Sequence, residues 1–319
     1  MFRITHNIQV GNYRLPQVSG FTIDRSMVSL TGLCSITIPR NIAYNGTKVS
    51  DLIKKGDAIT IEAGYDDNNS LLFSGYVKNI TLGTPIEVHG EDEMYRLKQI
   101  PCETMQYPDL HINTLLGQYL PADIENRVTD ASLGTFRVSN NPSLAAILDY
   151  IRQNYGLLFY FKNKQLFGVM PSTQLASNAD SLDIDFAVHV KADNLQYVSD
   201  EDVNLIIKVK TVLPDNTKLE VQEPEKATGG EVHTFLALEK KTEKELRDYA
   251  RNLLATYKPG NLQGSLTLYG RPLVEPGDFM KFFDADNQER NDKLCQVEKV
   301  NYQMNQSFMQ QIVTIGRNG

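Results

Sequence analysis

The sequence predicts a mainly β protein in which a small α/β domain separates two barrel-like β domains. Both ends of the chain show the alternation of apolar and polar residues that is typical of half-buried strands, whereas helical spacing concentrates in the middle. Each β region also contains a Gly-Asp turn that opens a strand. From these changes of pattern we expect domains at residues 1–101, 102–180 and 181–319.

The composition is that of an ordinary globular protein. The chain has 319 residues, of which 41% are hydrophobic and 22% charged, so it is long enough for two or three domains. No apolar run approaches the roughly 20 residues that span a bilayer, and the first residues lack the apolar segment of a signal peptide. We therefore expect synthesis in a cytoplasm and no stable insertion into a membrane.

The first β domain is organised around residues 54–98. Gly56 and Asp57 form a turn, after which Ile59 and Ile61 alternate with polar residues as in a half-buried strand. Residues 64–70 predict a polar connection to the next strand. The strands expected in this domain are 2–10, 17–25, 34–38, 58–63, 71–80 and 86–90.

The middle of the chain predicts helices. Apolar residues at helical spacing indicate a short helix from about 112 to 120. A second helix should begin at Asn140-Asn141-Pro142, with a capping Asn and a proline in its first turn, and end at Gly156. A β-hairpin over 157–169 follows, and the small polar residues of 172–181 indicate a linker.

The last part of the chain returns to strands around one helix. Thr242 and Glu245 form a capping box at the start of a helix of about 243–257, which we place in the second β domain. A later turn, Pro276-Gly277-Asp278, repeats the Gly-Asp pair of the first domain. The strands expected here are 186–198, 203–213, 218–222, 232–238, 265–269, 279–283, 294–304 and 308–315.

Charge and residue spacing argue against several functions. A net charge of −7, from 39 acidic and 32 basic residues, does not favour tight binding of nucleic acid. The five histidines lie in separate segments, and Cys34, Cys102 and Cys295 lack the spacing of a disulfide framework or a zinc site. No nucleotide-binding glycine loop or nucleophile elbow is present. We expect no cofactor and no metal site.

Three acidic clusters are weaker candidates for chemistry. Residues 66–70 carry the oxygen ligands of a calcium loop but lack the central glycine and distal glutamate, so a solvated hairpin tip is favoured over an ion site at Asp66-Asp67. Glu91-Asp92-Glu93 and Asp200-Glu201-Asp202 resemble the paired carboxylates of a glycosidase. The chain has no tryptophan to line a sugar cleft. We therefore favour turn roles and expect no catalytic residue.

Two ordered sets of motifs resemble phage tail baseplate hub proteins, the late control protein D family, which is similar to the hub region of type VI secretion spike proteins. The first set leads from Gly56-Asp57 to a strand that ends near Asp92, and the second follows the capped helix. The resemblance assigns fold-signature turns to Gly56, Asp57, Gly64, Tyr65, Gly75, Tyr76, Asp92, Gly270, Pro276, Gly277 and Asp278.

The resemblance implies a structural role in a virion. Hub chains form homotrimers in which two barrels per chain make a pseudo-sixfold ring, which joins the tail tube to the central spike and encloses a channel. The implied partners are tail tube or distal tail proteins, a central spike protein and baseplate wedge proteins, assembled in the bacterial host cytoplasm. DNA would pass through without specific binding. Because no spike, lysozyme or needle segment follows Gly319, we expect a stand-alone hub.

A function of another class remains open. The chain could be an enzyme or a carbohydrate-binding module of the tail tip that is directed at the cell envelope. That alternative needs a cleft in which carboxylates or aromatic side chains converge. We expect a structural protein that is not an enzyme.

Overall fold

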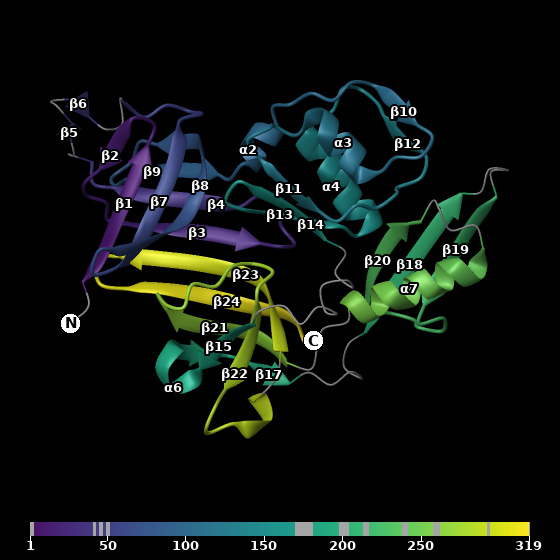
Figure 1. Cartoon of the computed structure of the whole chain (residues 1–319). Coiled ribbons are helices and arrows are strands. Elements are labelled where there is room, and N and C mark those ends of the chain that lie inside the picture. The colour runs from purple at the N-terminus through teal and green to yellow at the C-terminus, as the bar shows by residue number, and fades with distance from the viewer. Residues whose placement is uncertain are drawn as a thin grey trace.

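Figure 1 shows a large β region that holds both ends of the chain, an α/β unit beside it, and a smaller unit built around helix α7. The structure is a computed structural model that describes residues 3–40, 43–44, 47–48, 52–169, 181–197, 204–212, 217–237, 242–257, 262–291 and 294–318. The prediction of a mainly β protein is confirmed. None of the described helices is both long and apolar enough to cross a bilayer.

The N-terminal half of the large sheet follows the predicted strands closely. Its strands are β1 (Ile4–Val10), β2 (Tyr13–Leu15), β3 (Gly20–Ser26), β4 (Leu33–Ile38), β7 (Ala58–Tyr65), β8 (Asn68–Thr81) and β9 (Ile86–Glu91). The short β5 (Ala43–Tyr44) and β6 (Thr47–Lys48) pair with each other. The polar connection predicted at 64–70 is shorter, because only Asp66 and Asp67 link β7 to β8, both with positive φ as a tight hairpin turn requires.

The C-terminal half of the large sheet contains a helix where a strand is predicted. Its strands are β15 (Ser181–Asp185), β16 (Val190–Asp193), β17 (Gln196–Tyr197), β21 (Leu262–Tyr269), β22 (Phe279–Phe283), β23 (Leu294–Asn305) and β24 (Met309–Asn318). The strand predicted over 186–198 is wrong at its start, which forms helix α6 (Phe186–His189). Asp185 caps this helix by accepting a hydrogen bond from the Ala187 amide (2.9 Å). The short η1 (Gln288–Arg290) follows β22.

Strands β3 and β23 join the two halves into one sheet. They pair antiparallel over seven residues, from Gly20 opposite Asn305 to Ser26 opposite Lys299, and lie side by side in Figure 1. Among the described residues, the strands of both halves form one fourteen-stranded sheet with one apolar core. Arg25 of β3 adds an ion pair with Glu275 (2.8 Å), in which the guanidinium is 5% exposed. The two β regions are therefore not packed independently.

The α/β unit lies between the two halves in the sequence. It contains α2 (Met94–Leu97), α3 (Ile112–Tyr119), α4 (Leu144–Tyr155), β10 (Met105–Tyr107), β11 (Glu125–Val128), β12 (Phe136–Val138), β13 (Leu158–Lys162) and β14 (Gln165–Val169). The predicted helix at 112–120 and the hairpin of β13 and β14 are confirmed. Its apolar core includes Met94 and Leu97, so the packing of this unit reaches back before residue 102. The linker predicted at 172–181 lies outside the described residues except for Ser181.

The predicted start of helix α4 is wrong by a few residues. Asn140 and Asn141 have positive φ values of 65° and 45°, which places them in a turn before the helix. Ser143 is the capping residue instead, and its hydroxyl accepts a hydrogen bond from the Ala146 amide (3.2 Å). Gly156 ends the helix with φ of 74°, as predicted.

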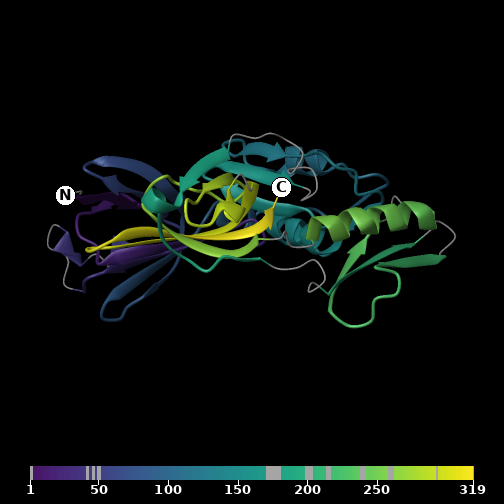
Figure 2. The ribbon, with the colours of Figure 1, turned by 90° about the horizontal axis from the view of Figure 1, so that it is seen from below.

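The capped helix belongs to a unit of its own, which differs from the predicted single domain over 181–319. Helix α7 (Glu243–Tyr257) packs on a three-stranded sheet of β18 (Leu205–Val212), β19 (Lys218–Glu223) and β20 (Glu231–Leu236). These elements share an apolar core that is separate from that of the large sheet. The capping box is confirmed, because Glu245 accepts from the Thr242 amide (3.0 Å) and Thr242 from the Glu245 amide (3.3 Å). Figure 2 shows this unit at the end of the molecule opposite β1.

We expect Tyr302→Phe to lower the free energy of unfolding by about 1–3 kcal/mol. The Tyr302 hydroxyl is buried beside the junction of the two halves and donates to the Val274 carbonyl, so its removal leaves a buried acceptor without this donor. Urea unfolding measures the loss. The matched control is Tyr150→Phe, whose half-exposed ring predicts a change within about 0.5 kcal/mol. Equal effects of the two substitutions would contradict a stabilising role of the buried Tyr302 hydrogen bond.

Candidate functional site

The first Gly-Asp turn is held by backbone and side-chain hydrogen bonds. The Gly56 amide donates to the Val77 carbonyl and the Val77 amide donates to the Asp57 carbonyl, both at 2.8 Å. The Asp57 carboxylate accepts from the Lys54 amide (2.7 Å). Gly56 has φ of 90°, a backbone conformation that glycine adopts without strain.

The second Gly-Asp turn has the same arrangement. The Gly277 amide donates to the Val297 carbonyl (2.8 Å), and the Val297 amide donates to the Asp278 carbonyl (2.9 Å). The Asp278 carboxylate accepts from the amide three residues earlier, that of Glu275 (2.8 Å), and Gly277 has φ of 86°. Pro276 stands directly before this glycine. The two turns are therefore equivalent in their hydrogen bonding.

A β-bulge follows each turn at the matching place. The register between β8 and β9 shifts between Val77 and Asn79, and the register between β23 and β24 shifts between Val297 and Lys299. A bulge bends a strand and increases its twist. Both halves of the sheet thus combine a Gly-Asp turn with a bend in the strand it contacts.

The second turn also binds the α/β unit. The Asp278 carboxylate accepts from Lys162 Nζ (2.6 Å), which extends from the end of β13. A Cβ atom on Gly277 would lie 2.4 Å from the hydroxyl of Tyr160, so any other residue would have to displace this ring, and its backbone would be strained at φ of 86°. A Cβ atom on Gly56, the equivalent glycine of the first turn, would meet nothing closer than the Tyr95 hydroxyl at 3.6 Å.

Tyr65 and Gly270, which the sequence assigns to different motifs, meet in the structure. The Gly270 amide donates to the Tyr65 hydroxyl, which donates to the Met309 carbonyl, both at 3.3 Å. Arg271 adds hydrogen bonds to the Asn68 carbonyl (3.1 Å) and the Ser70 hydroxyl (3.0 Å). The β7–β8 hairpin of one half therefore contacts the end of β21 in the other.

The remaining signature residues of the first half serve close packing. A Cβ on Gly64 would lie 2.0 Å from the Asn68 carbonyl oxygen, and one on Gly75 would lie 2.1 Å from that of Glu91. Tyr76 stacks on Tyr95 of α2, with ring centroids 5.7 Å apart. Tyr76 also lies opposite Ala58, the residue after the Gly-Asp turn, whereas Gly64 lies at the far end of β7.

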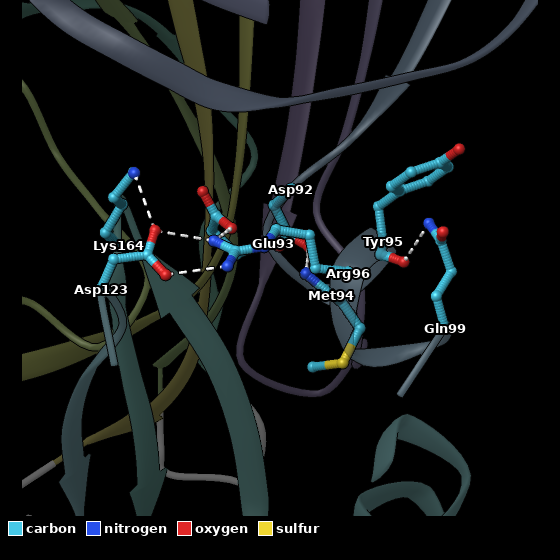
Figure 3. A network of polar contacts seen from close by, with 8 residues as sticks. All are labelled: Asp92, Glu93, Met94, Tyr95, Arg96, Gln99, Asp123 and Lys164. Carbon is cyan, nitrogen blue, oxygen red and sulfur yellow. Dashed lines mark hydrogen bonds and ion pairs between the residues drawn. The ribbon is translucent and has the colours of Figure 1, made fainter. Parts of the chain in front are cut away.

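Asp92 fixes the junction of β9 and α2 (Figure 3). Its buried carboxylate accepts from the Gly32 amide (2.7 Å) and the Met94 amide (3.0 Å). Burial raises the pKa of Asp92 to about 7, against the opposing effects of these hydrogen bonds and of Arg25. This aspartate therefore has a structural role between the sheet and the α/β unit.

The neighbouring carboxylates are engaged in ion pairs. Glu91 contacts Lys78 Nζ (2.6 Å) and Lys98 Nζ (2.8 Å), and these two lysines hold its pKa below the ordinary value despite burial. Glu93 pairs with Arg96 (3.2 Å), which also binds Asp123 through two hydrogen bonds of 2.8 Å. Figure 3 shows Asp123 between Arg96 and Lys164. These contacts tie α2 to the segment before β11 and to the β13–β14 turn.

The other candidates from the sequence do not form a chemical site. Asp66 accepts from the Arg3 amide (2.9 Å) and Asp67 pairs with the Arg3 guanidinium (2.7 Å), both at an exposed hairpin tip. Within the described part of the chain, no three His, Cys, Asp or Glu residues lie close enough to hold a metal ion. The three cysteines are buried and unpaired with one another. Asp200-Glu201-Asp202 lies outside the described residues.

A hollow of about 590 Å³ lies where the β7–β8 hairpin meets the second half of the sheet. Of its lining residues, the sequence points to Tyr65 as a signature residue and to Asp66 and Asn68 as part of the polar loop 66–70. The others come from α6 and the end of β21, and no local pattern signals that these segments meet the hairpin. The hollow is lined by Tyr65, Asp66, Asn68, Val188, Tyr269 and Arg271.

The fold is similar to solved structures of tail proteins, although no family model and no curated protein matches the sequence. The 43 kDa tail protein of prophage MuSo2 from Shewanella oneidensis has a TM-score of 0.68 at 14% identity, with 98% of each chain covered. A tail protein from Neisseria meningitidis has a TM-score of 0.67 at 12% identity, with 99% of this chain and 96% of that chain covered.

The likeness extends to type VI secretion. A component of this system from Escherichia coli, which has structural similarity to bacteriophage T4 tail proteins, has a TM-score of 0.58 at 9% identity, over 98% of this chain and 76% of that chain. The chain therefore has a fold that phage tail proteins and this secretion component share. At the level of the fold, the resemblance stated from the sequence motifs is confirmed.

We expect Asp92→Asn to destabilise the protein more at pH 5 than at pH 8. The unfolded chain releases the Asp92 proton near pH 4, but the folded protein holds it up to about pH 7, so stability from this group is lost as pH rises between these values. Asparagine has no such pH dependence. Urea unfolding of both proteins at the two pH values measures the difference.

Asp123→Asn is the control for this experiment. Arg96 and Lys164 hold the pKa of the half-exposed Asp123 far below its ordinary value, so it is ionised in both states at pH 5 and at pH 8. Its effect should be the same at both pH values. An Asp92→Asn effect that does not change with pH would contradict the assigned state of Asp92.

Proposed function

We propose that the protein is a structural hub of a phage tail or of a related injection apparatus. In this proposal three copies form a pseudo-sixfold ring that joins the tail tube to the central spike and encloses a channel. The observation that carries the proposal is the likeness to two tail proteins over 98–99% of this chain and 96–98% of theirs. Because the likeness covers whole chains, the same assembly role is the simplest use of the shared fold.

The equivalence of the two Gly-Asp turns supports a ring with twice as many similar units as chains. Each turn is closed by the same hydrogen bonds and is followed by a bulge at the same place. Three chains with two similar β halves give six similar units around an axis, which fits a sixfold tube on one face and a threefold spike on the other. We propose residues 1–101 and the sheet strands of 181–319 as these units, with the signature residues shaping their turns.

The partners in this proposal are tail tube or distal tail proteins, a central spike protein and baseplate wedge proteins. The proposed place of action is the virion tail, after assembly in the host cytoplasm. A net charge of −7 supports a channel that DNA crosses without specific binding, because a polyanion is not attracted to an acidic wall.

We also propose that the protein is not an enzyme. Glu91 and Glu93 are engaged by basic side chains, and Asp92 by backbone amides. Groups held in this way stabilise the packing of α2 against the sheet. They are not arranged around an open cleft, which a glycosidase requires between its two carboxylates.

Light scattering of the purified full-length chain, alone and with its spike protein, tests the proposal. We expect a species of three times the chain mass in at least one of these samples, since the ring needs three copies to complete six units. A protein that remains monomeric in both samples up to high micromolar concentration would contradict it. Release of soluble fragments from peptidoglycan would instead favour an envelope-directed enzyme.

A further inference from the structure

The two halves of the sheet correspond strand by strand beyond the Gly-Asp turns. In the first half the order is β7-β8-β9-β4-β3, and in the second it is β22-β23-β24-β21 followed by β16 and β17. Aligning Val77 with Val297 and following the pairing across each half matches the residues of these strands. The equivalent rows are Ile80, Val88, Ile36 and Phe21 in the first half, and Val300, Val313, Leu266 and Asp193 in the second.

This correspondence shows which strand edges pair at the β3–β23 junction inside the chain. Strand β23 binds β22 through residues 294–296 and β3 through residues 299–305. The equivalent of 299–301 in the first half is 79–81 of β8. The pairing of β8 with β7 stops at Tyr76. Among the described residues, no strand pairs with this side of β8 after Tyr76. The first half therefore has a free edge where the second half binds β3.

The second half has the complementary free edge. The equivalents of β3 are β16 and β17, and within the described chain both pair with β21 alone. Residues 191–194, 196 and 197 are exposed, whereas Leu195 is buried in the core, as is the equivalent Ile23 of β3. Among the described residues, the outer side of this edge therefore has no strand partner, and the residues on both sides of Leu195 are exposed.

We propose that the free edge of β8 in one copy pairs antiparallel with β16 and β17 of the next copy. This inference rests on the proposed ring and names the surfaces that close it. The register that repeats the β3–β23 junction places Ile80 opposite Tyr197, Thr81 opposite Gln196 and Leu82 opposite Leu195. Because each copy carries one edge of each kind, association is head-to-tail, and such an interface forms a ring when the rotation between copies closes after three.

The exposed apolar side chains of these edges fit the proposed pairing. Leu82 is 71% exposed and Tyr197 46%, while Ile80 is half-buried. The residues equivalent to Leu82 and Ile80 are Tyr302 and Val300, which the junction with β3 buries. Open strand edges with apolar side chains promote association, so pairing between copies satisfies both the backbone groups and these side chains.

An engineered disulfide between copies tests the register. The in-chain equivalents of Thr81 and Gln196 are Asn301 and Asp24, whose side chains contact each other across the strands at 2.9 Å. Directly opposed residues of antiparallel strands have Cβ atoms about 4.5–5.5 Å apart, close to the separation that a disulfide bridges. Mild oxidation of the Thr81→Cys/Gln196→Cys variant, assembled as the proposed trimer, should give covalent species of two and three chains in more than half of the protein.

The matched control shifts the register by one residue. In Thr81→Cys/Tyr197→Cys the two side chains point to opposite faces of the shared sheet, so we expect less than a tenth of this cross-linking. Neither single variant can link three chains. If the protein is trimeric by light scattering but the two double variants cross-link equally or not at all, the edge pairing is wrong and the proposed ring remains. If no trimer forms under any condition, the proposed ring itself fails.

A second variant does not depend on oxidation. Leu82→Arg should leave the folded chain intact, because the side chain is exposed, but weaken association at least tenfold by placing a charge in the pairing edge. The control is Val232→Arg, a change at a position that is 49% exposed on β20 in the separate unit of α7, for which we expect unchanged association. Sedimentation measures the association, and circular dichroism verifies the fold. Equal association of both variants would contradict the proposal.

Discussion

The backbone pairing of β3 with β23 is the interaction on which the rest of the structure depends. It makes one sheet and one core from segments at opposite ends of the chain. The ion pair of Arg25 with Glu275 and the contact of Tyr65 with Gly270 are made across the same two halves. Without the pairing, both strands would expose a row of unpaired amides and carbonyls beside apolar side chains, and such an open edge promotes aggregation.

The equivalence of the two halves connects this junction to assembly. Each half contains a Gly-Asp turn, a bulge after a valine and the same order of neighbouring strands, yet among the described residues only one of the two equivalent junctions is filled within the chain. The two strand edges that would form the other junction, that of β8 and that of β16 and β17, lie apart in the same chain. A fold with this property is suited to ring formation, because pairing between copies repeats a geometry that the chain already stabilises. The α/β unit and the α7 unit, with their own cores, lie outside this repeat.

Local chemistry explains which parts of the fold the sequence predicts. Strand β22 matches its prediction over 279–283, and the capping box of α7 has the predicted hydrogen bonds, because both depend on neighbouring residues. The sequence predicts a capping Asn in Asn140-Asn141-Pro142, but Ser143 caps the helix, because Asn and Ser both suit a cap and a turn with positive φ at Asn140 and Asn141 decides between them. The pairing of β3 with β23 and the separate core of α7 have no local signal, since they depend on contacts between distant segments. The same holds for the meeting of Tyr65 with Gly270.

Native-state hydrogen exchange tests most directly whether the β3–β23 pairing makes the two halves one cooperative sheet. We predict that amides of β9 and of β24, which lie in different halves, open with the same free energy and the same denaturant dependence. Amides of β18 should open independently, because that strand belongs to a separate core. Exchange in which β9 opens fully while β24 stays protected would contradict the account.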